Sequence, residues 1–323
     1  MSRFARRLQA GIDVPDAPTM SGWLSGASGT EAGNGTFATW RGTPVAIGGT
    51  WMDTNATAQT EGPSWSFNPG GPWANHTEAM DIAPGSIWLS AGETWASAAA
   101  GAYDSRWTTF WTNLKNTWSP RDPSKLYVRF AHEYNLTENP WRVDPAQVNN
   151  FITAWQRWHA IKQTVLPQAN LTWCPNAGNG YQSSYDIRST YPGDAYVDVI
   201  GVDWYNNWPW VNDATAFNNK INQTQSFGAP QGIEKWRQYA LSRGKPMAIC
   251  EWSSAANPAG AGGGGDAPVF MEQLYAWLSA NGGNGAGQVL YEVLFNVPGY
   301  SDSFQLYPST DQPLAAARYR DLF

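Results

Sequence analysis

Histidine and cysteine are scarce in this chain of 323 residues, which has three histidines and two cysteines. The cysteines form no CxxC pair and no Cys/His pattern with metal-ligand spacing. Cys174 and Cys250 both lie in apolar, strand-like runs. We therefore expect two buried free thiols, with a disulfide between them as the alternative. With so few histidines, no order of Ser, His and Asp argues for acyl-transfer chemistry.

Charge is also sparse, because Asp, Glu, Lys and Arg make up 14% of the chain, with a net charge of −6. A net negative surface repels phosphate backbones, so we expect no nucleic-acid partner. No run of about 18 apolar residues marks a membrane span, so no membrane partner is expected either. The start of the chain has basic residues without the apolar stretch of a secretory signal. A monomer is the default expectation.

Tryptophan, in contrast, is abundant, with 20 residues. Many stand among Asn, Gly and Pro, as in "TENPWRV" and "WYNNWPWVND". Packing in the core is the simple explanation for any one of them. A set of tryptophans in polar loops instead favours a ligand with flat, weakly polar faces, and sugar rings have such faces.

Eight short apolar runs recur along the chain, and most turn polar at their C-terminal ends. In order they are "TMSGWLSGA", "PVAIGGTW", "SIWLSAGETW", "LYVRFAHE", "NLTWCPN", "VDVIGVDWY", "PMAICEW" and "QVLYEVLFN". Continuous apolarity is typical of parallel strands that are buried on both faces. Helical spacing or capping residues predict helices between them over 104–118, 144–166, 232–244 and 267–283. Asp144 is the expected N-cap of the second helix, and Gly244 fits the end of the third.

Strands that alternate with helices predict an α/β fold of the (β/α)8 TIM-barrel type. No interior segment is long and polar enough to divide it, so we expect one catalytic barrel over 21–323. Residues 1–20 are expected to form an N-terminal arm outside the barrel, without regular structure. The glycine-rich segment 257–268 follows a strand end and is interpreted as a mobile loop on the active face.

Two of the predicted strands end directly on a glutamate, the fourth at Glu133 and the seventh at Glu251. Chemistry in such barrels gathers at the C-terminal ends of the strands. A glycosidase that works by double displacement needs two carboxyl groups about 5–5.5 Å apart, one as nucleophile and one as acid and base. The simpler alternative is that each glutamate pairs with an arginine.

The motifs "RFAHEYN", "DVIGVDWY" and "PMAICEWSS" resemble those of strands four, six and seven in glycoside hydrolase family 26. This family contains endo-β-mannanases, β-1,3-xylanases and mixed-linkage β-glucanases. The resemblance extends over about residues 20–323. It implies that Glu133 is the acid and base and that Glu251 is the nucleophile.

The same resemblance implies roles for neighbouring residues. Arg129 would keep Glu251 ionised, His132 would bind the sugar or orient a carboxylate, and Tyr205 would contact the nucleophile. Asp203 is expected to support the site rather than react. Further expected substrate contacts are Asn135, Trp204, Trp252, Trp95, Trp141, Trp208, Trp210 and Asn296.

The sequence departs from the mannanase pattern at two strand ends. No histidine ends the predicted third strand, where "GETW" leaves Trp95, and Phe295 or Asn296 stands where mannanases commonly have a tryptophan platform.

The two glutamates and the resemblance together predict a retaining endo-acting β-glycoside hydrolase on a mannan-type or related polysaccharide. Glycanases acting on a glucan, xylan, galactan or bacterial cell-wall polysaccharide, and a non-catalytic carbohydrate-binding barrel, stay as alternatives.

This mechanism requires no metal or organic cofactor. Its partner is a polysaccharide, so we expect the site of action to be extracellular or on a virus particle.

Overall fold

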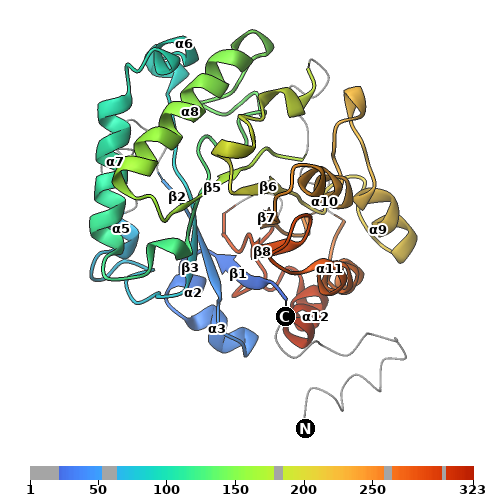
Figure 1. The fold of residues 1–323 in the computed structure, drawn as a ribbon. Coiled ribbons are helices and arrows are strands. Elements are labelled where there is room, and N and C mark those ends of the chain that lie inside the picture. Colours follow the sequence, from blue (N-terminus) through green and yellow to red (C-terminus); the bar gives the residue numbers. More distant parts are fainter. Residues whose placement is uncertain (1–21, 53–63, 178–184, 258–263, 300–302) are drawn as a thin grey trace.

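The computed structural model describes residues 22–52, 64–177, 185–257, 264–299 and 303–323. Within them, parallel strands pair in chain order from β1 to β8, and β8 closes the ring by pairing with β1. Helices surround this barrel (Figure 1). The predicted (β/α)8 fold is confirmed. The expected arm at 1–20 and part of the 257–268 loop lie outside the described residues.

The strands are short and almost wholly buried. Their bounds are β1 Leu24–Ser28, β2 Ile47–Trp51, β3 Ala79–Ala83, β4 Leu126–Val128, β5 Asn170–Trp173, β6 Val199–Asp203, β7 Met247–Trp252 and β8 Val289–Leu294. Seven of the predicted runs overlap these strands. Parallel strands covered on both sides need apolar residues at successive positions, which explains why continuous runs located them.

The third predicted strand is wrong. The run "SIWLSAGETW" forms a 3₁₀ turn at Leu89–Ala91 and the start of helix α6 (Trp95–Ala99), whereas β3 lies earlier, in "AMDIA". A charged Asp81 interrupts that run, which hides it from a search for continuous apolarity. Asp81 is nevertheless fully buried, because it pairs with Arg129. Since β3 ends at Ala83 and Pro84 follows, no histidine stands at this strand end either.

The described helices include those predicted over 104–118, 144–166, 232–244 and 267–283, and six further helices that were not predicted. Together they are α2 Thr30–Gly33, α3 Thr36–Arg41, α5 Ser64–Phe67, α6, α7 Asp104–Trp118, α8 Val148–Val165, α9 Ala214–Ile221, α10 Ile233–Ser242, α11 Pro268–Asn281 and α12 Pro313–Leu322. Asp144 does not cap α8 as predicted. It precedes a 3₁₀ turn at Pro145–Gln147, and its side chain accepts no capping hydrogen bond. Gly244 follows α10 in the left-handed conformation, as a C-terminal glycine does.

Aromatic side chains fill the space between the barrel and helices α6, α7 and α8, which lie together on one side of the molecule (Figure 1). Phe130 stacks on Trp158 with ring centroids 4.6 Å apart, and it also contacts the edges of Trp107 and Trp155. We call Trp107, Phe130, Trp155 and Trp158 the outer aromatic cluster. All four are fully buried, so these tryptophans serve packing and not a ligand.

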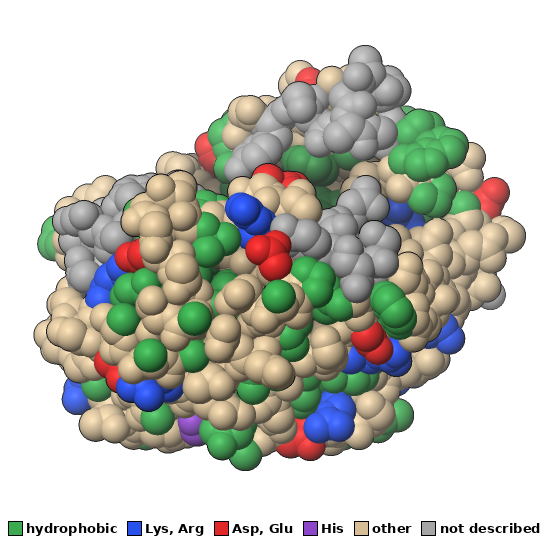
Figure 2. All heavy atoms as spheres, turned by 90° about the horizontal axis from the view of Figure 1, so that it is seen from above, with side chains coloured by type: hydrophobic (Ala, Val, Ile, Leu, Met, Phe, Trp, Pro, Cys, Tyr) green, Lys and Arg blue, Asp and Glu red, His purple; other side chains and the backbone are tan. Residues whose placement is uncertain are grey.

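The two cysteines are buried free thiols, as expected. On the face seen in Figure 2, acidic and basic side chains are scattered singly among uncharged ones rather than gathered in a patch of one sign. A search of the described helices finds none with the length and apolarity that a bilayer crossing requires.

Candidate active site

The turn after β4 positions Glu133. The strand itself ends at Val128, earlier than predicted, and Glu133 lies five residues further on. Ala131 and Glu133 have left-handed backbones, with φ of 53° and 50°, which end the extended chain and re-aim its side chains. Asn139 donates a 2.7 Å hydrogen bond to the Glu133 carbonyl. The indole of Trp141 donates one of the same length to the His132 carbonyl, so the unusual turn is held by side chains.

Glu251 lies in β7 and is 5% exposed. Its Oε1 accepts hydrogen bonds from the Trp51 indole at 2.7 Å and from Arg129 at 2.8 Å. Its Oε2 accepts one from the Tyr205 hydroxyl, also at 2.8 Å. Three donors from three different strand ends thus fix the orientation of this carboxylate.

Arg129 is the centre of a buried ion network below the site. Besides Glu251, it binds Asp81 at 2.5 Å and Asp203 at 3.2 Å, and all of these groups except Glu251 are fully buried. Tyr291 donates to the second oxygen of Asp81 at 2.7 Å. Burial raises the pKa of Asp203 well above its usual value, the charge of Glu251 raises it further, and Arg129 opposes both. One guanidinium therefore compensates several carboxyl groups that compete for protons.

Glu133 and Glu251 converge at this end of the barrel. One carboxylate oxygen of each lies within 4.8 Å of the other, and an oxygen of Asp203 lies within the same distance of both. Both glutamates line a pocket of about 540 Å³. This upper limit is below the ~6.5–9.5 Å between the carboxyl groups of inverting glycosidases and is compatible with the ~5–5.5 Å of retaining ones. The positive charge at this carboxylate group is supplied by Arg129.

The two glutamates differ in their surroundings. Burial raises the pKa of Glu133 to about 7, and the charge of Glu251 acts in the same direction, against the Asn176 hydrogen bond and Arg129. Glu133 can therefore hold a proton near neutral pH, while Glu251 is surrounded by donors. A carboxyl group that holds a proton near neutral pH can act as an acid, and a carboxylate oriented by several donors is placed to act as a nucleophile.

Asn176, which follows β5, was missed by the sequence reasoning. Its amide donates to Oε1 of Glu133. Asn135 holds Asn176 in place, because its amide binds the Asn176 carbonyl at 2.9 Å and its oxygen accepts from the Asn176 N–H at 2.8 Å. Asn135 is fully buried, so the substrate contact predicted for it is replaced by a positioning contact.

Several predicted groove residues do line the large pocket, namely His132, Trp141, Tyr205 and Phe295. Burial, and next the charge of Arg129, holds the pKa of His132 well below its usual value, so the ring is neutral at physiological pH. The His132 and Trp141 rings lie 5.3 Å apart. Trp51, a second residue missed from the sequence, also lines the pocket and meets Phe295 edge-on at 5.3 Å. Trp51 is the last residue of a predicted strand, and this position is the signal in the sequence that could have identified it as a site residue.

Three predicted substrate contacts are instead buried in the core, so those predictions are corrected: Trp95, Trp252 and Asn296. A fourth, Trp204, is also buried, but it lines the smaller pocket described below. Trp95 packs on Phe130 and Phe151, and Trp204 packs on Phe270 of α11. Trp252 donates its indole N–H to Glu292. Asn296 binds the backbone of Leu306 and Tyr307. Alternate residues of a strand point to opposite faces, so a tryptophan next to a site residue turns away from it.

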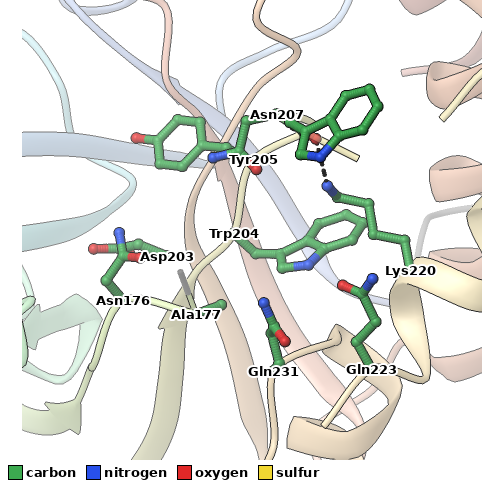
Figure 3. Close-up of a pocket in the computed structure, with 10 residues that line it drawn as sticks. Asn176, Ala177, Asp203, Trp204, Tyr205, Asn207, Lys220, Gln223 and Gln231 are labelled. Atoms are coloured by element: carbon green, nitrogen blue, oxygen red, sulfur yellow. Dashed lines mark hydrogen bonds between the residues drawn. The ribbon is translucent and has the colours of Figure 1, made fainter. Parts of the chain in front are cut away.

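Trp208 is 69% exposed and lies against Trp210, with ring centroids 4.7 Å apart. It lines a second, smaller pocket that also includes Tyr205 and Asp203 (Figure 3). Trp208 thus shares a pocket with Asp203 but lies outside the pocket that both glutamates line.

Comparison with known proteins gives matches in sequence and in structure. Residues 149–230 match the model of glycosyl hydrolase family 26. The chain is 25% identical over 187 residues to a mannan endo-1,4-beta-mannosidase of Bifidobacterium adolescentis, a match that covers 57% of this chain and 18% of that protein. The chain thus spans about a fifth of the length of this curated relative.

Solved structures agree in fold. A modular endo-β-1,4-mannanase from Cellulomonas fimi aligns with a TM-score of 0.63 and 16% identity, over 93% of this chain and 70% of that one. The catalytic domain of a family 26 endo-β-1,4-mannanase from Bacillus sp. JAMB-750 aligns with a TM-score of 0.60 and 15% identity, over 93% and 86%. The predicted resemblance to glycoside hydrolase family 26 is confirmed. The segment matched by the family model contains Asn176, Asp203 and Tyr205 but neither glutamate.

Proposed function

We propose that this protein is a retaining endo-acting β-glycoside hydrolase that cleaves a β-linked polysaccharide of the mannan type or a related glycan. The observation that supports this most is the pair Glu133 and Glu251. Their carboxylate oxygens lie within 4.8 Å of each other in a pocket of about 540 Å³. A pocket of this size is in the usual range for small-ligand sites, about 300–1,000 Å³.

In the first step Oε of Glu251 attacks the anomeric carbon and forms a covalent glycosyl-enzyme. The bond to the leaving sugar oxygen breaks, and Glu133 gives its proton to that oxygen. Arg129, Trp51 and Tyr205 hold the attacking carboxylate in one orientation before the reaction. Pre-set orientation of this kind lowers the entropic part of the barrier.

In the second step Glu133, now ionised, takes a proton from a water molecule that attacks the same carbon. The bond to Glu251 breaks, and the sugar leaves with its original anomeric configuration. The raised pKa of Glu133, about 7, suits a group that must both lose and regain a proton near neutral pH. His132 and the Trp141 edge would contact the sugar in the pocket.

A mannan is our first substrate because the curated relative is named a mannan endo-1,4-beta-mannosidase. Phe295, which lines the pocket where a tryptophan is expected in mannanases, keeps glucan, xylan, galactan and cell-wall polysaccharides as alternatives. Such polymers lie outside cells, so we propose that the protein acts there.

The test is hydrolysis of a panel of β-linked polysaccharides, with products followed by mass spectrometry and by proton NMR during the first minutes. We expect internal cleavage and new reducing ends that are initially β. Initial α-anomers would contradict the retaining mechanism. Absence of cleavage across the panel, together with measurable binding, would support a non-catalytic barrel instead.

A further inference from the structure

The smaller pocket beside the active site, of about 60 Å³, lies where the segment after β6 faces α9 (Figure 3). Tyr205 lines both pockets, and Asn176, whose amide binds Glu133, lines the smaller one. Trp51 and Phe295 line the large pocket on its β2 and β8 side. A polysaccharide bound at the carboxylates would therefore place a neighbouring sugar unit next to the smaller pocket.

The smaller pocket is lined mainly by uncharged hydrogen-bonding groups. Gln223 and Gln231 turn their side-chain amides towards it (Figure 3), and these amides make no hydrogen bond within the described chain. Trp208, largely exposed, also lines it. An open pocket with unused amide donors and an exposed indole is suited to a polar group attached to a sugar ring.

Lys220 of α9 is the cation of this pocket, and it is buried. Its ammonium donates to the carbonyls of Asn207 at 2.7 Å and Pro209 at 2.9 Å, and it lies 5.9 Å from the Trp204 ring centroid. Among the described residues no carboxylate forms an ion pair with it. Asp203 lines the same pocket, but it pairs with Arg129.

A buried cation without a counter-charge is costly, because dehydration of the charge is not repaid. In agreement, burial lowers the pKa of Lys220 to about 8. An anion in the pocket would supply the missing charge and accept hydrogen bonds from the two glutamine amides. The pocket of about 60 Å³ has room for a few water molecules, each of which needs about 10–15 Å³ of such space, and so for a small anionic group.

We propose that this pocket binds an anionic substituent, a carboxylate or a sulfate, on a sugar next to the cleaved bond. Lys220, Gln223 and Gln231 would hold the substituent, and Trp208 would cover the sugar that bears it. The inference rests on the proposed function and narrows its substrate class to acidic or sulfated β-glycans. If Lys220 served only to tie down the segment after β6, anionic substituents would bring no advantage.

The test compares three forms of one polymer: glucomannan, glucomannan partly oxidised to C6 carboxylates, and sulfated glucomannan. We expect kcat/KM on one anionic form to exceed that on the parent by about tenfold, the effect of one or two hydrogen bonds with a charged partner. Gln231→Glu adds a negative charge without removing a hydrogen bond to the chain, and it should abolish this preference. Gln168→Glu, the same change on an exposed residue before β5, should retain it.

Binding to the Glu251→Gln variant separates the inference from the proposed function. We expect calorimetry to show about tenfold tighter binding of carboxylated or sulfated oligosaccharides than of neutral ones, lost on adding Gln231→Glu. Equal binding and equal turnover of neutral and anionic forms would overturn the inference while the hydrolase proposal stands. Tight binding of anionic forms without cleavage by the wild type would overturn the hydrolase proposal alone.

Discussion

Tryptophan has two different roles in the two aromatic regions of this molecule, the active-site pocket and the outer aromatic cluster. In the pocket, Trp51 and Trp141 direct their indole N–H groups to site atoms, the Glu251 carboxylate and the His132 carbonyl. In the cluster, Trp158 is fully buried, and its N–H has no partner among the described residues. The position of a tryptophan relative to the strand ends, and not its residue type, therefore decides whether it serves the site or the packing of the core.

The largest expected effect is in the pocket. Glu251→Gln removes the proposed nucleophile but keeps an acceptor for Trp51, so we expect kcat to fall by roughly 10⁴-fold or more on every active substrate. Initial rates on the best polysaccharide, with circular dichroism to verify folding, measure this. Glu78→Gln, the same change on an exposed residue paired with Lys125, should keep full activity. Substantial turnover by the Glu251 variant would remove it as the nucleophile.

The second-largest effect is expected in the outer aromatic cluster, and it concerns stability rather than activity. Trp158→Ala removes a buried ring that stacks on Phe130, so the free energy of unfolding should fall by about 3–5 kcal/mol. Urea denaturation followed by fluorescence measures the loss. Activity per folded molecule should be unchanged, since no cluster residue lines the pocket. A selective loss of activity without a loss of stability would contradict the division into two regions.

A pH dependence tests how the pocket tunes its acid. The pKa of Glu133 is raised to about 7, so its proton is present below that pH and lost as the pH rises through it. We therefore expect kcat/KM to decline above about pH 7. Asn176→Ala removes a hydrogen bond that lowers this pKa, so the decline should move to higher pH.

The matched control for that shift is Asn281→Ala at the end of α11, which also loses one amide hydrogen bond but lies beside the start of β8, at the end of the barrel opposite the carboxylates. Its pH profile should coincide with that of the wild type. A shift to lower pH in the Asn176 variant would contradict the assignment of Glu133 as the proton donor.

The smallest effect is expected at the exposed indole. Trp208→Ala should change the free energy of unfolding by no more than about 0.5 kcal/mol, because the side chain is largely exposed. If it covers a bound sugar, KM should rise several-fold with kcat nearly unchanged. A stability loss as large as that of Trp158→Ala would show that exposure does not separate the two kinds of tryptophan.

The sequence by itself determined the barrel, because continuous apolar runs followed by helical spacing report burial on both faces of parallel strands. It also located Glu133 and Glu251 as polar residues at strand ends. It could not reveal β3, whose Asp81 looks unfavourable until Arg129 is placed beside it from another strand. Burial of a charge depends on a partner 48 residues away, which no local pattern contains.

The tertiary structure alone decided which neighbours of the glutamates face the pocket. Trp252 and Asn296 stand beside site residues in the chain yet turn into the core, whereas Trp51 and Asn176 arrive from the ends of other strands. Strands buried on both faces are apolar at successive positions, so the pattern that reveals the strand does not tell its two faces apart. Closure of the barrel assigns each side chain to the pocket or to the core.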